Sequence, residues 1–425
     1  MQILYLSIII ITILLIWDFK KGVLIYAPMK LFFNMNVRLS SLITFDLAVN
    51  ILILILFIIK RKKLINERFP FGKAFLIYGV GYTLTCLFPT PVFNFIPRIV
   101  ISVLLFSYVY YYCLDGYKNI KVAIYSYAIF SIILCGNGLL QPLLGINPLD
   151  DYIQSVSFED LSIFSTNDLV RMGQERYRSF IPHSISYGVA CCVIFYLIFW
   201  AFNSKIIKGK IIMAFSIMLL LSGIVMCGSR SPILGLVPLV YLFFVPGVFT
   251  KNMKKYIIIV LIIFLFVSGD YLVYSIQSIF DPQVAAKAEG SDISLRIRQL
   301  AISLDFFMQK PIFGHAINFD FFKYNSDILG AESVWFPLLI KGGLVGTISY
   351  ALIYYFFYKI FIKTSGKVFL LVFTLGWLIM RSATSLIGVT DVQFFTIIFI
   401  IYKYYKIRIY ENLNHNTRLQ CRKIH

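Results

Sequence analysis

Long apolar runs, each bounded by charged or turn-forming residues, recur along almost the whole of this 425-residue chain. Only 14% of its residues are charged, whereas a soluble domain carries about a quarter. Runs of about 20 apolar residues can cross the hydrocarbon core of a bilayer, where a helix satisfies its own backbone hydrogen bonds. The sequence therefore predicts an all-α polytopic membrane protein with about 12 transmembrane helices, within a range of about 11 to 13.

The segment 22–36 decides between these counts. It is hydrophobic, but Pro28, Lys30 and Asn34 interrupt it, so it is either a surface-lying piece or a short thirteenth span. We prefer twelve spans. They are residues 3–17, 42–59, 74–88, 92–114, 122–139, 184–202, 211–226, 232–249, 257–274, 342–361, 368–386 and 392–404.

Basic clusters predict the orientation of the spans, because Lys and Arg accumulate in inner loops. Lys60-Arg61-Lys62-Lys63 is the strongest cluster, and the other basic groups alternate correctly with it. Twelve spans put the N-terminus inside, whereas Lys20 and Lys21 favour thirteen spans with the N-terminus outside. The predicted divisions are N-terminal transmembrane helices (1–140), a first outer loop (141–183), central transmembrane helices (184–274), a second outer loop (275–341), C-terminal transmembrane helices (342–405) and an inner tail (406–425).

Arginine is concentrated on the outer face, where positive charge is normally sparse. The inner loops between Lys60 and Lys367 carry fifteen lysines and only two arginines. The arginines of the outer face are Arg171, Arg176, Arg178, Arg230, Arg296, Arg298 and Arg381. Because the planar guanidinium matches phosphate oxygens in a bidentate way, we expect these residues to bind an anionic headgroup outside the cytoplasm.

The net charge of +19 does not indicate a nucleic-acid partner. In a membrane protein such a charge reflects positive inner loops and a basic tail. The seven cysteines and four histidines show no ligand spacing for a metal, so we expect neither a metal nor another cofactor.

Two short outer segments contain candidate binding residues. The first loop ends in a segment with Arg176, Arg178 and His183 directly before a span; it either grips a lipid-linked phosphate or anchors the interface. The second is the turn Cys227–Pro232, whose only charge is Arg230. A helix that starts at Pro232 would also offer free backbone N–H groups to an anion.

The second outer loop is predicted to contain an amphipathic helix, residues 292–307, with Ser291 or Asp292 as its cap. Its apolar positions, Ile293, Ile297, Leu300 and Leu304, would lie on or against the membrane domain. Arg296 and Arg298 diverge by about 200° on such a helix, so one faces the site and the other faces water or lipid headgroups.

Glu332 begins a hydrophobic stretch on the outer side that follows the helix-breaking segment Lys310–His315. A carboxylate in this position is either an acid favoured by a helix dipole or a general base set in apolar surroundings. The sequence leaves both readings open.

Taken in chain order, the arginine segment, the Arg230 turn, the amphipathic helix and the Glu332 segment resemble the O-antigen polymerase and ligase superfamily of bacterial surface-polysaccharide assembly. Its members have four motifs in chain order, in which φ is an apolar residue. The first is an arginine-containing segment with Phe and Pro before a span, and the second is a Ser-Arg-Gly/Ser turn between two spans. The third is an arginine-bearing amphipathic helix followed by a Pro-φ-Phe-Gly break, and the fourth is a His-Asn-like pair before a Gly-φ-φ-Gly segment. The resemblance covers about residues 176–350. The corresponding residues here are Arg178/Phe180/Pro182, Ser229/Arg230/Ser231, Arg296 with Pro311–Gly314, and Glu332/Ser333 with Gly343–Gly346.

The resemblance implies a GT-C-like, metal-independent, inverting glycosyltransferase whose donor is a glycan on undecaprenyl pyrophosphate. It implies that Arg178, Arg230 and Arg296 bind pyrophosphate, supported by Arg298 and Arg381, and that Glu332 is the first candidate base and His183 the second. Ligases of the superfamily typically have histidine where this chain has Glu332, which favours a polymerase. His183 or His315 is the candidate substitute for that histidine.

The expected partners are therefore undecaprenyl-pyrophosphate-linked oligosaccharide, membrane lipids and a chain-length regulator protein, without nucleic acid. The expected location is the bacterial inner membrane, with a multi-pass chain and an active site that faces the periplasm. A ligase that transfers glycan to lipid A–core is the nearest alternative. A flippase or exporter of lipid-linked oligosaccharide is the alternative from another class.

Overall fold

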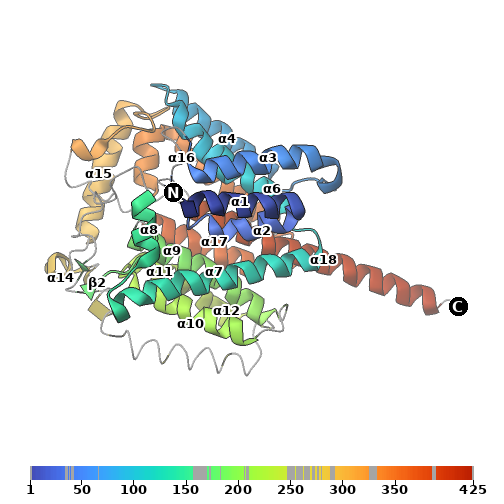
Figure 1. Cartoon of the computed structure of the whole chain (residues 1–425). Helices are drawn as coiled ribbons and strands as arrows, with labels where there is room; N and C mark the ends of the chain where they lie inside the picture. The colour runs from blue at the N-terminus through green and yellow to red at the C-terminus, as the bar shows by residue number, and fades with distance from the viewer. Residues whose placement is uncertain are drawn as a thin grey trace.

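The protein is a bundle of helices in the computed structural model (Figure 1). The structure describes residues 2–33, 37, 39, 43–65, 67–156, 170–171, 174–181, 183–204, 206, 210–246, 254, 262, 269, 273–274, 277–278, 280–287, 292–324, 333–384 and 389–423.

The elements follow one another along the chain in three groups. The N-terminal group is α1 (Gln2–Trp17), α2 (Phe19–Met29), α3 (Phe45–Leu64), α4 (Gly72–Leu87), η1 (Phe93–Phe95), α5 (Ile96–Ile99), the π-helix η2 (Val100–Leu105), α6 (Phe106–Cys113), α7 (Gly116–Leu144) and α8 (Pro148–Val156). The central group is β1 (Val170–Arg171), β2 (Gln174–Glu175), α9 (Ser184–Asn203), α10 (Lys210–Met226), α11 (Arg230–Leu236), η5 (Val237–Val240) and α12 (Tyr241–Phe244). The C-terminal group is α14 (Pro282–Lys287), α15 (Ile293–Gln309), η6 (Phe321–Lys323), α16 (Trp335–Phe361), α17 (Lys367–Ser382) and α18 (Val389–Lys423).

The predicted all-α class is confirmed for the part of the chain that the structure describes. The exception is a single antiparallel pair, β1–β2, of two residues a strand. Among the described residues, four helices are long and apolar enough to cross a membrane: Phe93–Cys113, Gly116–Leu144, Ser184–Asn203 and Trp335–Phe361. Shorter apolar helices cover Leu6–Trp17, Ile211–Met226 and Arg230–Phe244. The predicted span 257–274 lies almost wholly outside the described residues.

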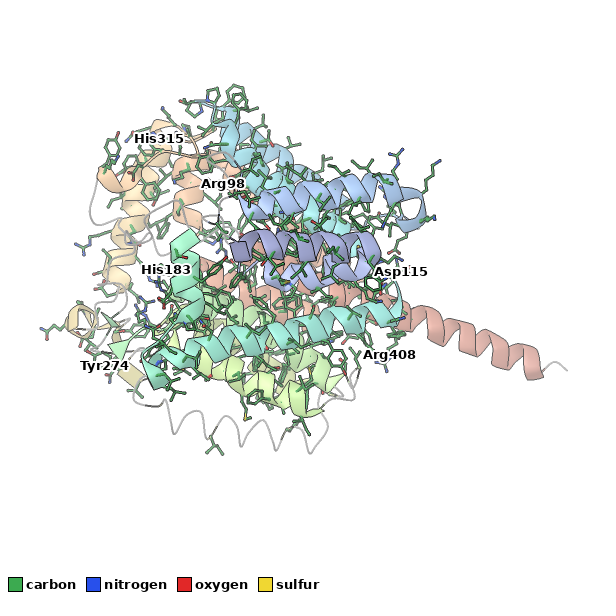
Figure 2. The ribbon with its side chains drawn as sticks, viewed as in Figure 1. Arg98, Asp115, His183, Tyr274, His315 and Arg408 are labelled. Atoms are coloured by element: carbon green, nitrogen blue, oxygen red, sulfur yellow. The ribbon has the colours of Figure 1, made fainter. Side chains whose placement is uncertain are left out.

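The two ends of the bundle differ in character. Figure 2 shows His183, Tyr274 and His315 at one end, which we call the loop end. Asp115 and Arg408 lie at the opposite end, which we call the basic end, where α18 also projects from the bundle. The sequence predicts that the loop end faces outward and the basic end inward.

The N-terminal helices form an antiparallel hairpin in which only Asp18 separates α1 from α2. At this turn Lys20 pairs with Asp115 at 2.9 Å, so the turn lies at the basic end and α1 begins at the loop end (Figure 1). Most of α2 is buried against α1, α6 and α7. The helical part of the segment 22–36 is therefore not a surface-lying piece. This hairpin puts the start of α1 at the loop end, where the thirteen-span alternative expects the N-terminus; the number of spans stays a prediction.

A cluster of ionic and aromatic groups joins the loop before α4 to α18 at the basic end. The Glu67 carboxylate accepts hydrogen bonds from Lys403, Lys406 and the Tyr111 hydroxyl. Partial burial would raise the pKa of Glu67, but the hydrogen bonds from the two lysines outweigh it and lower the pKa to about 2. Phe69 packs edge-on against Tyr111 and against α18.

Candidate functional site

Two arginine-bearing segments that are far apart in the sequence meet at the loop end. The Arg176 Nε donates to the Cys227 carbonyl oxygen at 3.2 Å, and the Tyr177 amide donates to the Met226 carbonyl at 3.0 Å. Gly228, in the same turn, has a φ of 61°, and a Cβ there would lie 2.8 Å from the Arg176 Cγ. The end of the first loop is therefore fastened to the turn that leads into α11.

The backbone beside Arg178 is held in a strained conformation. Ser179 has a φ of 54°, which is unusual for a residue other than glycine, and its hydroxyl donates to the Leu134 carbonyl at 2.8 Å. Two amide side chains bind it as well: Asn137 donates to its hydroxyl at 3.0 Å and Asn147 to its carbonyl at 2.8 Å. Strain of this kind persists where surrounding contacts over-determine it, often at functional sites. This network fixes the position from which the half-buried Arg178 projects.

Phe180 anchors the same segment from the other side. Its side chain is fully buried, with ring centroids 5.2 Å from Phe32 and 6.0 Å from Phe130. The first loop thus ends in a rigid segment that is bound to α7, α2 and the α10–α11 turn. Pro182 of the same motif lies outside the described residues.

Arg230 begins α11 and is only 8% exposed. Its Nη1 donates to the Ser278 hydroxyl at 3.2 Å, and Ser278 belongs to the second predicted outer loop. The turn that contains Arg230 therefore contacts both outer segments, through Arg176 on one side and Ser278 on the other.

His183 caps α9. Its Nδ1 accepts a hydrogen bond from the Ile185 amide at 3.1 Å. A ring nitrogen that accepts is unprotonated, so the neutral imidazole carries its proton on Nε2. This arrangement suits binding of an oxygen atom better than removal of a proton.

The predicted amphipathic helix is α15, and Asp292 is its cap. The Asp292 carboxylate accepts from the Leu295 amide at 2.8 Å and from the Ser294 hydroxyl at 2.6 Å, and these bonds lower its pKa. Arg296 is half-buried and Arg298 is exposed, as their angular separation predicts.

The apolar face of α15 does not pack on the protein, contrary to one of the two predicted placements. Its polar residues Gln299 and Ser303 are fully buried, because α15 packs mainly along α16 through that side. The four apolar positions are exposed, namely Ile293, Ile297, Leu300 and Leu304. Because α15 packs along α16, Arg296 belongs to the α15–α16 pair, whereas the Arg176–Cys227 contact lies at the α10–α11 turn.

The Pro-Ile-Phe-Gly segment after α15 caps a break in α16. Gly343 interrupts α16 with φ 56° and ψ −150°. The two amides that this break releases, those of Leu344 and Val345, donate to the carbonyls of Pro311 at 2.8 Å and Ile312 at 3.1 Å. The two glycine-containing motifs that the sequence singles out therefore form one structural unit.

These elements belong to a region with a recognisable family signature. Residues 215–351 match the family model described as O-antigen ligase. The match covers about a third of the chain and contains Arg230, Arg296 and the capped break in α16. It agrees with the O-antigen polymerase and ligase superfamily that the sequence resembles. No curated protein and no solved structure matches the chain.

Glu332 falls within the O-antigen ligase match but lies outside the described residues. The segment directly after it is bound to the end of α17. The Val334 amide donates to the Arg381 carbonyl at 3.0 Å, and the Trp335 indole donates to the Ser382 hydroxyl at 3.0 Å. Arg381 itself is fully buried. The structure thus brings Arg381 close to Val334 and the start of α16.

His315 is engaged in packing. Its amide donates to the Ile340 carbonyl at 2.8 Å, its Nε2 lies 2.9 Å from the Phe306 carbonyl oxygen, and its ring stacks on Phe319 at 4.6 Å. These contacts hold the loop before η6 against α16. They do not favour His315 as a substitute for the ligase histidine.

Sequence reasoning missed two features. Arg98 lies over the Phe95 ring at 4.8 Å at the start of the helix 93–113, and the apolar run around it assigned it to a span. The preceding Pro97, a common residue at a helix start, was the available signal. The strained Ser179 has no sequence signature, because the asparagines that hold it are distant in the chain.

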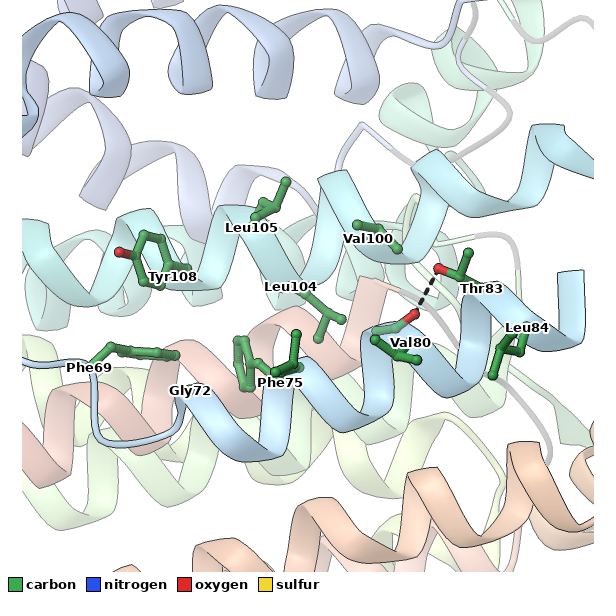
Figure 3. Close-up of a pocket in the computed structure, with 12 residues that line it drawn as sticks. Phe69, Gly72, Phe75, Val80, Thr83, Leu84, Val100, Leu104, Leu105 and Tyr108 are labelled. Carbon is green, nitrogen blue, oxygen red and sulfur yellow. Dashed lines mark hydrogen bonds between the residues drawn. The ribbon is translucent and has the colours of Figure 1, made fainter. Parts of the chain in front are cut away.

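Two sizeable apolar grooves are not part of this arginine-rich region. One, of about 500 Å³, lies between α4 and the η2–α6 segment (Figure 3). Its Thr83 hydroxyl donates to the Gly79 carbonyl at 2.7 Å, so it presents almost no free polar group. Another, of about 580 Å³, lies between α2 and α7 and is equally apolar. We assign no chemistry to either groove.

Proposed function

We propose that the protein is a polysaccharide polymerase of the O-antigen type. It would transfer a glycan from undecaprenyl pyrophosphate to a sugar hydroxyl of another lipid-linked repeat unit. The observation that carries this proposal is the junction of the Arg176–Arg178 segment with the Arg230 turn, next to a region that matches the O-antigen ligase family. Guanidinium groups gathered at one end of a helical bundle are suited to a diphosphate.

The reaction needs charge stabilisation and positioning more than it needs a metal. The acceptor hydroxyl gives its proton to a base, and its oxygen attacks the anomeric carbon from the face opposite the diphosphate. The bond from that carbon to the diphosphate oxygen breaks, and its electron pair leaves with undecaprenyl pyrophosphate. Fixed donors aimed at the departing diphosphate lower the barrier, because they need no reorganisation. The product linkage has inverted configuration.

The residue roles in this proposal follow the expected set. Arg178 and Arg230 bind the diphosphate at the junction, with Arg296 contributed by α15 and Arg298 and Arg381 in supporting positions. Glu332 is the first candidate for the base and His183 the second. Because its Nδ1 accepts from the Ile185 amide, His183 would take up a proton only at the cost of that hydrogen bond, which ranks it below Glu332 as the base.

The proposed setting is the bacterial inner membrane, with the loop end in the periplasm and the basic end in the cytoplasm. The proposed architecture is GT-C-like with about 12 or 13 spans. The N-terminal, central and C-terminal helices frame two periplasmic loops, with the divisions expected from the sequence. A chain-length regulator is the proposed protein partner.

Ligation of finished glycan to lipid A–core is the second candidate, because the matching family model is described as O-antigen ligase. Glu332, where ligases typically have histidine, speaks against it. A flippase or exporter would line a central cavity with charged groups, whereas both grooves described above are apolar.

Deletion of the gene separates these candidates. A polymerase predicts cells that display a single repeat unit on each core molecule, with long chains restored by the intact gene. A ligase predicts core molecules without any glycan and an accumulation of lipid-linked polymer. Unchanged surface glycan in the deleted cells contradicts both.

A further inference from the structure

Arg381 is a buried cation whose donors are poorly used. It lies in the last turn of α17 with 0% of its surface exposed. Within the described part of the chain, none of its three side-chain nitrogens makes a well-formed hydrogen bond. Its neighbours Asp391 and Tyr350 interact with it electrostatically, and the Tyr350 hydroxyl also lies within hydrogen-bonding reach of the guanidinium, although in poor geometry.

Burying a guanidinium in this way costs free energy unless a ligand or a water molecule accepts its hydrogen bonds. A guanidinium has five N–H donors, and a buried charged group without hydrogen bonds loses its hydration without compensation. Buried polar groups in folded proteins are nearly always paired, so an exception calls for a ligand or ordered water. Arg381 is the described residue with the greatest number of such nitrogens.

The groups around Arg381 indicate what kind of ligand fits. The Asp391 carboxylate, 5% exposed, already balances the charge of the guanidinium. The buried Tyr350 hydroxyl lies close to Arg381 and to the Tyr354 hydroxyl, but it makes no well-formed hydrogen bond to any described residue. A diphosphate would place added negative charge beside Asp391. An uncharged ligand rich in hydroxyl groups can accept from Arg381 and donate to Asp391 without that repulsion.

Aromatic rings enclose the same position. The Trp377 ring lies 5.3 Å from the Arg381 Cζ, and its indole N–H donates to the Tyr354 hydroxyl at 3.0 Å. The Trp335 ring is 5.7 Å from the Tyr350 ring, edge to face. Aromatic faces combined with charged and hydroxyl groups suit a saccharide, which has apolar C–H faces between its hydroxyls.

The position is also next to the segment that contains the candidate base. The Trp335 indole donates to the exposed Ser382, which directly follows Arg381 in the chain. Val334, bound through its amide to the Arg381 carbonyl, is two residues from Glu332. A sugar held by Arg381 would therefore lie beside Val334, at the start of the segment that leads into α16.

We propose that Arg381, Asp391 and Tyr350 bind the sugar of the acceptor repeat unit, separately from the arginines that bind the donor diphosphate. This inference rests on the proposed glycosyl transfer and reassigns Arg381 from diphosphate to acceptor sugar. Opening of the Trp335–Ser382 contact admits the sugar. Arg381 and Tyr350 then donate to its hydroxyl oxygens, and Asp391 accepts from a hydroxyl.

Two probes test the assignment by binding alone, on the purified full-length protein in lipid nanodiscs. One is the free oligosaccharide that mild acid releases from the lipid-linked repeat unit of cells lacking the gene. The other is undecaprenyl pyrophosphate without sugar. Arg381→Gln is expected to weaken oligosaccharide binding at least about tenfold and undecaprenyl pyrophosphate binding less than about twofold. Arg230→Lys is expected to show the opposite pattern.

Matched variants separate binding from folding. Tyr350→Phe removes a hydroxyl without a well-formed partner among the described residues and is expected to weaken oligosaccharide binding severalfold. Tyr354→Phe removes a hydroxyl that already accepts from Trp377 and should lower the unfolding temperature more than the affinity. Arg408→Gln, at the basic end, controls for loss of positive charge. Arg381→Lys replaces Arg381→Gln if the latter does not fold.

Three results overturn the proposal. The first is a wild-type protein that does not bind the oligosaccharide. The second is a folded Arg381 variant with unchanged oligosaccharide affinity, which makes Arg381 structural. The third is selective loss of undecaprenyl pyrophosphate, which makes the position an anion site. Failure of the proposed function is seen separately, in the surface glycan of the deleted cells.

Discussion

Gly343 in α16 and Gly314 in the segment after α15 touch through their backbones. A Cβ at Gly343 would lie 2.6 Å from the Gly314 amide nitrogen, and a Cβ at Gly314 would lie 2.4 Å from the Lys341 carbonyl carbon. Both residues also have positive φ, at 56° and 70°. Neither position has room for a side chain, so this contact fixes how the second predicted outer loop is attached to α16.

Replacement of Gly343 by Ala should break this attachment. The clash and the positive φ together should cost about 2 kcal/mol or more, and the variant should unfold at a lower temperature with reduced polymer yield. Gly136→Ala is the matched control, because a Cβ on this helical glycine meets nothing within 4 Å. Thermal unfolding in mild detergent measures both. Equal unfolding temperatures for the two variants would show that the break in α16 is not tightly capped.

The two arginines of α15 should differ in effect. Arg296 is half-buried and Arg298 exposed, so only Arg296 is placed to contribute to a partly desolvated site. Arg296→Gln should lower polymer yield at least about tenfold, whereas Arg298→Gln should lower it less than about threefold. Gel separation of surface glycan from cells that express each variant measures this. A larger loss for Arg298 would reverse the proposed orientation of the helix.

A buried ion pair joins the N-terminal hairpin to α3. Lys30 donates to Asp46 and, at 3.1 Å, to the Asn50 side-chain oxygen, while Asp46 accepts from Tyr26 at 2.9 Å. Lys30→Met leaves the Asp46 charge without its counter-ion and should destabilise the protein by about 3–5 kcal/mol. The double variant Lys30→Met/Asp46→Leu removes both charges and should recover a large part of this loss. A double variant less stable than Lys30→Met would mean that the rest of the network, not the ion pair, carries the stability.

The Glu67 cluster predicts a pH dependence at the basic end. The pKa of Glu67 is about 2, below its ordinary value of 4.5, so the ionised carboxylate stabilises the fold. This contribution is complete above pH 4.5 and is lost as the pH falls from 4.5 toward 2. At pH 7, Glu67→Gln should be less stable than the natural protein by on the order of 2 kcal/mol. The difference in unfolding temperature should shrink below pH 4.5; a difference independent of pH would exclude the ionic contribution.

The helices could be predicted from the sequence because transfer into a bilayer depends on local composition. The bounds of the predicted span 184–202 agree with those of α9 to within one residue, and those of the predicted span 211–226 agree equally well with α10. The cap of α15 was also predictable, since an Asp before an amphipathic period marks a helix start. The face that α15 buries was not, because it depends on the shape of α16.

The site depends on contacts that local patterns do not contain. Arg176 and Cys227 are 51 residues apart, and no periodicity relates them. The sequence did not show which arginine, Arg176 or Arg178, contacts the α10–α11 turn, because this depends on the backbone conformation at Ser179. The sequence placed Arg381 at the outer face, but its aromatic enclosure comes from two helices, α16 and α17.

Arg230→Lys in purified membranes supplied with extracted lipid-linked repeat units tests the central claim most directly. Lysine keeps the charge but loses the planar fork, so the account predicts at least about a tenfold loss of polymer and of released undecaprenyl pyrophosphate. Polymer length and yield equal to those of the natural protein would contradict the claim that an arginine at this turn holds the departing diphosphate.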